Sequence, residues 1–261
     1  MNIVISFIII FLSCVVGAIA GIGGGVIIKP TLDTFNVFDI FTINSVSSWS
    51  VFAMSIVSII TQTRKSETKL NKKIALFLAV SSMLGGILGS SLFSMVTSSI
   101  TNDGQVKAIQ AIILSLLLVF VIIYMNTPLK KYCWHVENPL LIMVVGLSLG
   151  LCGAFLGIGG GPINVAFLMI FFGMSVKGCA IYSIITIFFG QASKLVTMAF
   201  SGGFVGMDFT LLLWLIPAAI IGGFVGSKLK VHISEKSTSL LFMVSMIVII
   251  VLNGVNIVRA F

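Results

Sequence analysis

Gly17-Ala18-Ile19-Ala20-Gly21-Ile22-Gly23-Gly24-Gly25 is the stretch that decides the fold, because the chain contains it twice. The second copy, Gly153-Ala154-Phe155-Leu156-Gly157-Ile158-Gly159-Gly160-Gly161, begins just past the middle of the chain of 261 residues. Both copies lie within strongly apolar sequence. A glycine-interrupted apolar segment that recurs in both halves of a chain is typical of the substrate site of a transporter built from two repeats.

The composition predicts an all-α integral membrane protein. Hydrophobic residues make up 58% of the chain and charged residues only 8%, whereas about a quarter of a soluble protein is charged. Apolar runs of roughly 20 residues, long enough to cross a ~30 Å hydrocarbon core, recur along the chain. Because these runs are continuous rather than alternating, they favour helices. We expect eight spans, at 3–20, 40–62, 74–96, 108–126, 139–156, 178–199, 209–227 and 238–258.

The first span is expected to be retained rather than removed as a signal peptide. No positive charge precedes its apolar run, and its glycine segment recurs in the middle of the chain. The loops between the eight spans leave no room for a soluble catalytic domain.

Three consecutive glycines inside an apolar run predict a broken, re-entrant helix. Each glycine costs about 1 kcal/mol relative to alanine in a helix, and glycine permits a sharp reversal and close backbone approach to a ligand. New half-helices are expected to start at Val26 and Pro162, with positive dipole ends that favour an anion. We therefore predict a substrate site that includes Gly23, Gly24, Gly25, Gly159, Gly160 and Gly161. The alternative is helix packing alone, since glycines spaced by four also form packing stripes.

A second repeated segment defines the two halves. Gly85–Leu92 matches Gly222–Leu229, and we expect these glycines to pack helices together. The sequence therefore divides into a first transmembrane repeat at 1–126, a linker at 127–138 and a second transmembrane repeat at 139–261.

The basic residues predict opposite orientations for the two repeats. If both glycine segments dip into the membrane and return, eleven of the 15 basic residues fall on the linker side. The positive-inside rule then makes the linker cytoplasmic and both termini extracytoplasmic, in an inverted repeat of the cell membrane. The eleven are Arg64, Lys65, Lys69, Lys72, Lys73, Lys130, Lys131, Lys177, Lys228, Lys230 and Lys236.

Four polar residues within the apolar segments are further candidates for substrate binding. Lys194, with Gln191 beside it, would place a positive charge on an anion path, or alternatively extend to the headgroups. Lys29 follows the first break by one turn and faces either an anion vestibule or the outer surface. Asn164, one turn into the second half-helix, would donate to an oxyanion or form an interhelical bond. Hydroxyls such as Ser47, Ser48, Ser183 and Thr186 are weaker candidates, because membrane hydroxyls often bond their own helix.

The sequence contains no motif of an enzyme. Metal-ligand spacings, nucleophile elbows and phosphate-binding loops are missing, so we expect no catalytic residue, no metal and no cofactor. The net charge of +8 lies in short loops, which excludes nucleic acid as the expected partner. The expected partners are the lipid bilayer and a small anion, and homo-oligomerisation is left open.

The motif Gly21-Ile22-Gly23-Gly24-Gly25-Val26-Ile27-Ile28-Lys29-Pro30-Thr31-Leu32 resembles the sulfite exporter TauE/SafE family, also called the toluene sulfonate uptake permease family. The second copy keeps the glycines and Leu168, but has Ala166 in place of the proline. The resemblance covers essentially the whole chain and implies transport of sulfite, sulfonates or related sulfur-containing anions.

The direction of transport follows from charge. No carboxylate lies within the spans, so no proton relay is available, and one anionic charge leaving a cell gains about 2.3 kcal/mol per 100 mV. We therefore expect a potential-driven exporter or facilitator of a small anion. The alternative is an uptake permease for a sulfur-containing metabolite, coupled to an ion gradient.

Overall fold

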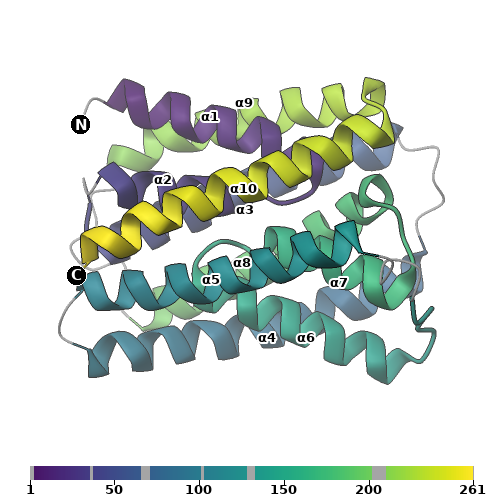
Figure 1. Cartoon of the computed structure of the whole chain (residues 1–261), viewed down its shortest axis with the longest axis horizontal. Coiled ribbons are helices and arrows are strands. Elements are labelled where there is room, and N and C mark those ends of the chain that lie inside the picture. Colours follow the sequence, from purple (N-terminus) through teal and green to yellow (C-terminus); the bar gives the residue numbers. More distant parts are fainter. Residues whose placement is uncertain are drawn as a thin grey trace.

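The protein is all-helical over the residues that its computed structural model describes, which are 3–35, 38–65, 71–100, 103–127, 133–201 and 210–260. Figure 1 shows long helices running side by side along one direction. The elements are α1 (Ile3–Ala20), α2 (Gly25–Phe35), α3 (Ile40–Lys65), α4 (Lys72–Ser99), α5 (Asp103–Asn126), α6 (Pro139–Leu156), α7 (Gly161–Phe172), α8 (Val176–Phe200), α9 (Thr210–His232) and α10 (Glu235–Ala260).

The eight long helices are the predicted membrane spans. Each is long and apolar enough to cross a bilayer, and each coincides with a predicted span to within a few residues. The two short helices, α2 with 11 residues and α7 with 12, follow the glycine segments. They begin at Gly25 and Gly161, one residue before the predicted starts.

The two repeats pack against each other in exchanged pairs. Helix α4 of the first repeat packs on α6 of the second, and α9 of the second packs on α1 of the first. An added Cβ at Gly89 would lie 2.3 Å from the carbonyl oxygen of Leu151, and one at the matching Gly226 would lie 2.3 Å from that of Val15. The predicted packing role of these repeated glycines is confirmed, because nothing larger fits.

The molecule has two distinct ends, which we call the linker end and the termini end. Figure 1 places both chain termini at one end of the bundle. At that end Asn256 of α10 donates to the carbonyl of Pro30 in α2, at 3.0 Å. At the linker end, the backbone NH of Val136 donates to the carbonyl of Phe171 in α7, at 2.8 Å. The half-helices α2 and α7 therefore run in opposite directions, each away from the centre.

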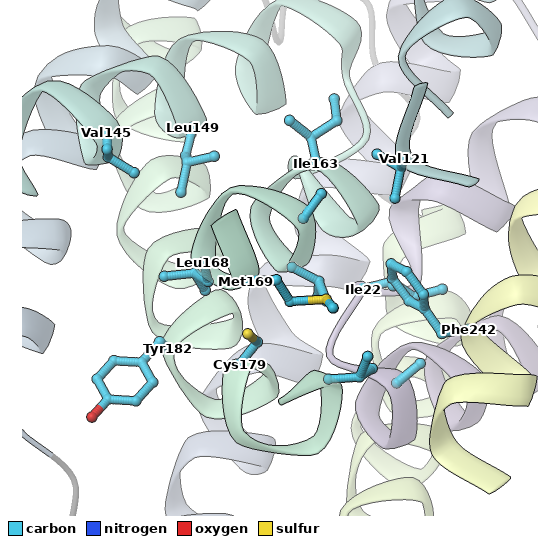
Figure 2. Close-up of a cluster of buried hydrophobic side chains, with 14 of the residues drawn as sticks. Ile22, Val121, Val145, Leu149, Ile163, Leu168, Met169, Cys179, Tyr182 and Phe242 are labelled. Atoms are coloured by element: carbon cyan, nitrogen blue, oxygen red, sulfur yellow. The ribbon is translucent and has the colours of Figure 1, made fainter. Parts of the chain in front are cut away.

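The main apolar core joins the two repeats around α7. Figure 2 shows Leu168 and Met169 of α7 beside Cys179 of α8, with Val121 of α5 and Phe242 of α10 in the same cluster. This packing fixes the half-helix against full-length spans, so its start is held at a defined depth.

Candidate functional site

The two glycine breaks share the left-handed geometry of two matched glycine pairs, whereas Gly160, with φ of 84°, has no left-handed counterpart at Gly24. Gly21 and Gly23 have φ of 75° and 64°, and Gly157 and Gly159 have φ of 70° and 78°. This left-handed region disfavours any side chain with a Cβ. In both copies the preceding helix continues to the break and then reverses, so the prediction of a broken helix is confirmed in place of packing alone.

The two breaks contact each other at the centre of the molecule. An added Cβ on Gly25 would lie 2.6 Å from the carbonyl oxygen of Ile158, and one on Gly161 would lie 2.0 Å from that of Ile22. Each half-helix therefore starts against the backbone of the other break. The glycines at these positions are required by close backbone approach.

Two serines fix the breaks to the neighbouring long helices. Ser183 of α8 donates to the carbonyl of Gly21 at 2.6 Å, and Ser47 of α3 donates to the carbonyl of Gly157 at 3.4 Å. Ser47 and Ser183 are separated by the same interval as Gly21 and Gly157, and so occupy matching places in the two repeats. The sequence alone ranks them as weaker candidates. By contrast, Ser48 and Thr186 bond carbonyls of their own helices, as expected for membrane hydroxyls.

The side chains around the two breaks differ strongly. Around the first break, added Cβ atoms would meet Ala180, Ile187 and Cys14. Around the second, they would meet the side chains of Asn44 at Gly157, Gln191 at Gly159 and Asn164 at Gly160. The polar groups of the site are thus concentrated at the second break.

All three amides around the second break are buried and carry unused hydrogen-bonding atoms. Asn44, Asn164 and Gln191 are each at most 2% exposed. Both polar side-chain atoms of Asn44 and of Asn164, and the Oε1 atom of Gln191, have no partner among the residues that the structure describes. Buried polar groups are nearly always hydrogen-bonded, so three together indicate that a ligand or water completes this site.

Lys29 lies against the same break but is held by protein acceptors. Its ammonium donates to the side-chain oxygen of Gln110 and, at 2.9 Å, to the carbonyl of Leu156. It is 4% exposed, so it does not lie on the outer surface. Gln110 in turn donates to the carbonyl of Phe155 at 2.6 Å. Lys29 and Gln110 therefore connect α2 and α5 to the end of α6.

A cavity of about 270 Å³, which we call the vestibule, leads from the termini end toward this break. That volume holds a multi-atom anion together with several waters, since one water needs only about 10–15 Å³ on the same measure. Its wall is rich in hydroxyls. The lining residues are Phe41, Asn44, Ser90, Ser91, Phe93, Ser94, Met95, Ser98, Lys194, Thr197, Met198 and Ser201.

Lys194 is the cation of the vestibule. It is 1% exposed, and its ammonium nitrogen has no hydrogen-bond partner in the part of the chain that the structure describes. Six residues separate it from the end of α8, which is about 9 Å of helix. Lys194 therefore lines the vestibule as a buried side chain, and its contact with an anion stays a prediction.

The ten predicted site residues are brought close to one another but do not all line one cavity. Lys194 lies in the vestibule, whereas the cavity of about 10 Å³ beside Gly159 and Gln191 has room for one water at most. Gly23, Gly24, Gly25, Gly160 and Gly161 are packed against protein. Contact between these glycines and an anion stays a prediction.

Asn44 and Gln110 are not among the site residues predicted from the sequence. Asn44 is an amide near the start of an apolar span, one turn before Ser47 and Ser48, and this spacing was a usable signal. Its match in the second repeat is Ala180, so the amide is present in one repeat alone. Gln110 gave no such signal, because its role depends on which face of α5 meets Lys29.

In the part of the chain that the structure describes, eight apolar spans, two opposed half-helices and a vestibule with a buried lysine define an all-helical integral membrane protein built from two repeats. Comparison with known families places it more narrowly. Residues 6–252 match the model of the family described as Sulfite exporter TauE/SafE, and the chain belongs to this family.

The chain is also similar to part of one curated protein. The chain is similar to the "Probable membrane transporter protein MamO" of Magnetospirillum gryphiswaldense, with 32% identity over 98 residues. The matched segment is 36% of this chain and 16% of the relative, so the two proteins share only part of their lengths.

Proposed function

We propose that this protein transports a small oxyanion, sulfite or an organosulfonate-type sulfur compound, through the vestibule and past the second glycine break. The observation that carries the proposal is the buried ammonium of Lys194, which has no partner in the described chain. A lysine within a span costs about 2.5–3.5 kcal/mol on insertion scales. An anion in the vestibule would offset that cost.

The chemistry of the wall suits an oxyanion. Lys194 supplies charge, the amide of Asn44 supplies N–H donors, and the serine and threonine hydroxyls supply further donors. Among the described residues the recorded ion pair is Lys107 with Asp33, so no carboxylate neutralises Lys194. A site with donors and a free cation favours anions over cations or neutral solutes. The sulfur-containing class comes from the family, whose name specifies sulfite.

The direction that we propose is export. The positive-inside rule assigns the linker end to the cytoplasm of a cell-membrane protein, and the vestibule then opens outward. A membrane potential negative inside drives a monovalent anion outward with about 2.3 kcal/mol per 100 mV. Transport therefore requires no coupled ion.

Anion flux in proteoliposomes tests the proposal. Vesicles loaded with sulfite are given potassium diffusion potentials of either sign, and efflux is followed for the wild type, Lys194→Gln and Lys228→Gln. Lys228 is an exposed lysine at the opposite end of the bundle and serves as the matched control. We expect efflux to rise with an inside-negative potential and to fall about tenfold or more in Lys194→Gln alone.

Two results would contradict the proposal. Flux that is independent of the potential would refute electrogenic export, and dependence on a proton gradient would favour coupled uptake. Equal flux in the wild type and in Lys194→Gln would remove the vestibule from the path.

A further inference from the structure

A second buried lysine lies at the linker end, within a closed polar cluster. Lys230 of α9 is 7% exposed and donates to the side-chain oxygen of Gln62 in α3, at 2.8 Å. The amide nitrogen of Gln62 donates to the carbonyl of Ala18 at 3.2 Å and to the hydroxyl of Ser227 at 3.4 Å. Nearby on α3 is Ser58, whose buried hydroxyl has no partner in the described chain. We call Ser58, Gln62, Ser227 and Lys230 the linker-end cluster.

When the two repeats are aligned with each other, the positions of the linker-end cluster match positions of the vestibule wall. Helices α3 and α8 correspond in the register that matches Val51 with Ile187, and these two side chains pack together on both Gly23 and Gly159. Helices α4 and α9 correspond in the register that matches Gly89 with Gly226.

In these registers, four residues of the vestibule wall find their matches in the linker-end cluster. Lys194 corresponds to Ser58, Met198 to Gln62, Ser90 to Ser227 and Phe93 to Lys230. The cluster therefore occupies, at the linker end, the place that this part of the vestibule wall occupies at the termini end.

Each of these two matching places contains one buried lysine, but on different walls. In the vestibule the lysine is on α8 and Phe93 is on α4, whereas in the cluster the lysine is on α9 and Ser58 is on α3. The ammonium of Lys230 is bonded to a neutral amide oxygen, and no carboxylate of the described chain is recorded within ion-pair distance of it. A neutral acceptor is a weaker partner for an ammonium group than an anion is.

We propose that Lys230, with Ser227 and Ser58, is a second anion-binding station, which accepts a small oxyanion from the linker face when the anion replaces Gln62 as the partner of Lys230. This inference rests on the proposed function. Gln62 occupies the anion's place in this structure and also ties the cluster to the end of α1, one turn before the first break. Loading the station would release that tie.

Face-specific kinetics test the station. Initial rates of sulfite entry are measured in right-side-out and in everted membrane vesicles, so that the anion is offered to one face at a time. We expect Lys230→Gln to raise the half-saturating sulfite concentration about tenfold at the linker face and to leave that of the termini face unchanged. Lys228→Gln, which removes an exposed lysine two residues away that stacks on the Phe224 ring at 4.2 Å, should change neither.

A second variant tests the station even if Lys230→Gln does not fold. Gln62→Glu keeps the side-chain size and gives Lys230 a permanent carboxylate partner, which competes with the anion. The same rise at the linker face alone is expected.

The outcomes separate this inference from the proposed function. Equal shifts at both faces, or none at either, in folded Lys230→Gln and Gln62→Glu would overturn the station while wild-type flux still supported transport. Absence of wild-type sulfite flux from both faces would overturn the proposed function and the station together.

Discussion

Replacement of Lys194 by methionine should make the protein more stable and unable to bind its anion. The lysine is fully buried, and its ammonium bonds to no described group, so the folded protein carries a desolvation cost without compensation. Insertion scales put that cost at about 2.5–3.5 kcal/mol for a lysine deep in a span. Methionine has a similar length and no charge, so it should fill the same space. At roughly 2–4 °C per kcal/mol, we expect the Tm to rise by about 5–14 °C.

The assay is thermal unfolding of the purified protein with and without sulfite. An anion at about 100 times its Kd stabilises the wild type by about 2.7 kcal/mol, and this increment should disappear in Lys194→Met. Lys228→Met, a substitution of an exposed lysine, should change neither quantity. A Lys194→Met variant that is less stable than the wild type, or that keeps the sulfite-dependent increment, would refute the assignment of Lys194 as the cation of the vestibule.

Three further contrasts between substitutions test the architecture by thermal unfolding. Gly161→Ala should destabilise the protein by about 1–3 kcal/mol or prevent folding, because the added Cβ would lie 2.0 Å from a carbonyl oxygen of the first break. Gly254→Ala should instead stabilise α10 by about 1 kcal/mol, because no described atom lies within 4 Å of the added Cβ. Ser183→Ala should cost about 1–3 kcal/mol, because it leaves a break carbonyl unpaired, whereas Thr186→Val should cost less, since that hydroxyl bonds its own helix. Lys29→Met should destabilise, opposite in sign to Lys194→Met, because it leaves two buried acceptors without a donor. Equal effects within any of these contrasts would contradict the corresponding contacts.

The fold was predictable because each of its main signals is local in sequence. An apolar run of about 20 residues specifies a span wherever it packs, and three consecutive glycines break a helix whatever surrounds them. The duplication then predicted two equivalent breaks, and the described backbone has two, with similar φ angles at Gly21 and Gly157 and at Gly23 and Gly159.

The polar chemistry of the site was less predictable, because it depends on which face of a helix meets the break. Sequence spacing placed Lys29 and Lys194 near the site but could not separate their roles. One is bonded to Gln110, and the other has no partner in the described chain and lies in the vestibule. The imbalance between Asn44 and Ala180 was visible in the aligned halves, yet its meaning required knowing that position 44 contacts the second break.

The backbone of the glycine breaks is duplicated in the two repeats, whereas the polar side chains are not, because different constraints act on them. Gly25 packs on the second break and Gly161 on the first, so a larger residue at either position disturbs both half-helices. Neither copy is free to change. The side chains that line the vestibule and the linker-end cluster are not constrained in this way. Of each matched pair of positions in the two repeats, one residue lies in the vestibule and the other in the linker-end cluster, so the two can differ.

A lysine retained in both copies would place two ammonium groups in one buried site. Their repulsion would add to a desolvation cost that is already several kcal/mol per buried ion. Lys194 and Phe93 both line the vestibule, and Lys230 corresponds to Phe93 in the linker-end cluster, so Lys194 and Lys230 come from different helices of the two repeats. Divergence of side chains on a fixed, duplicated backbone therefore lets each of the two matching places contain one of these two lysines without the other.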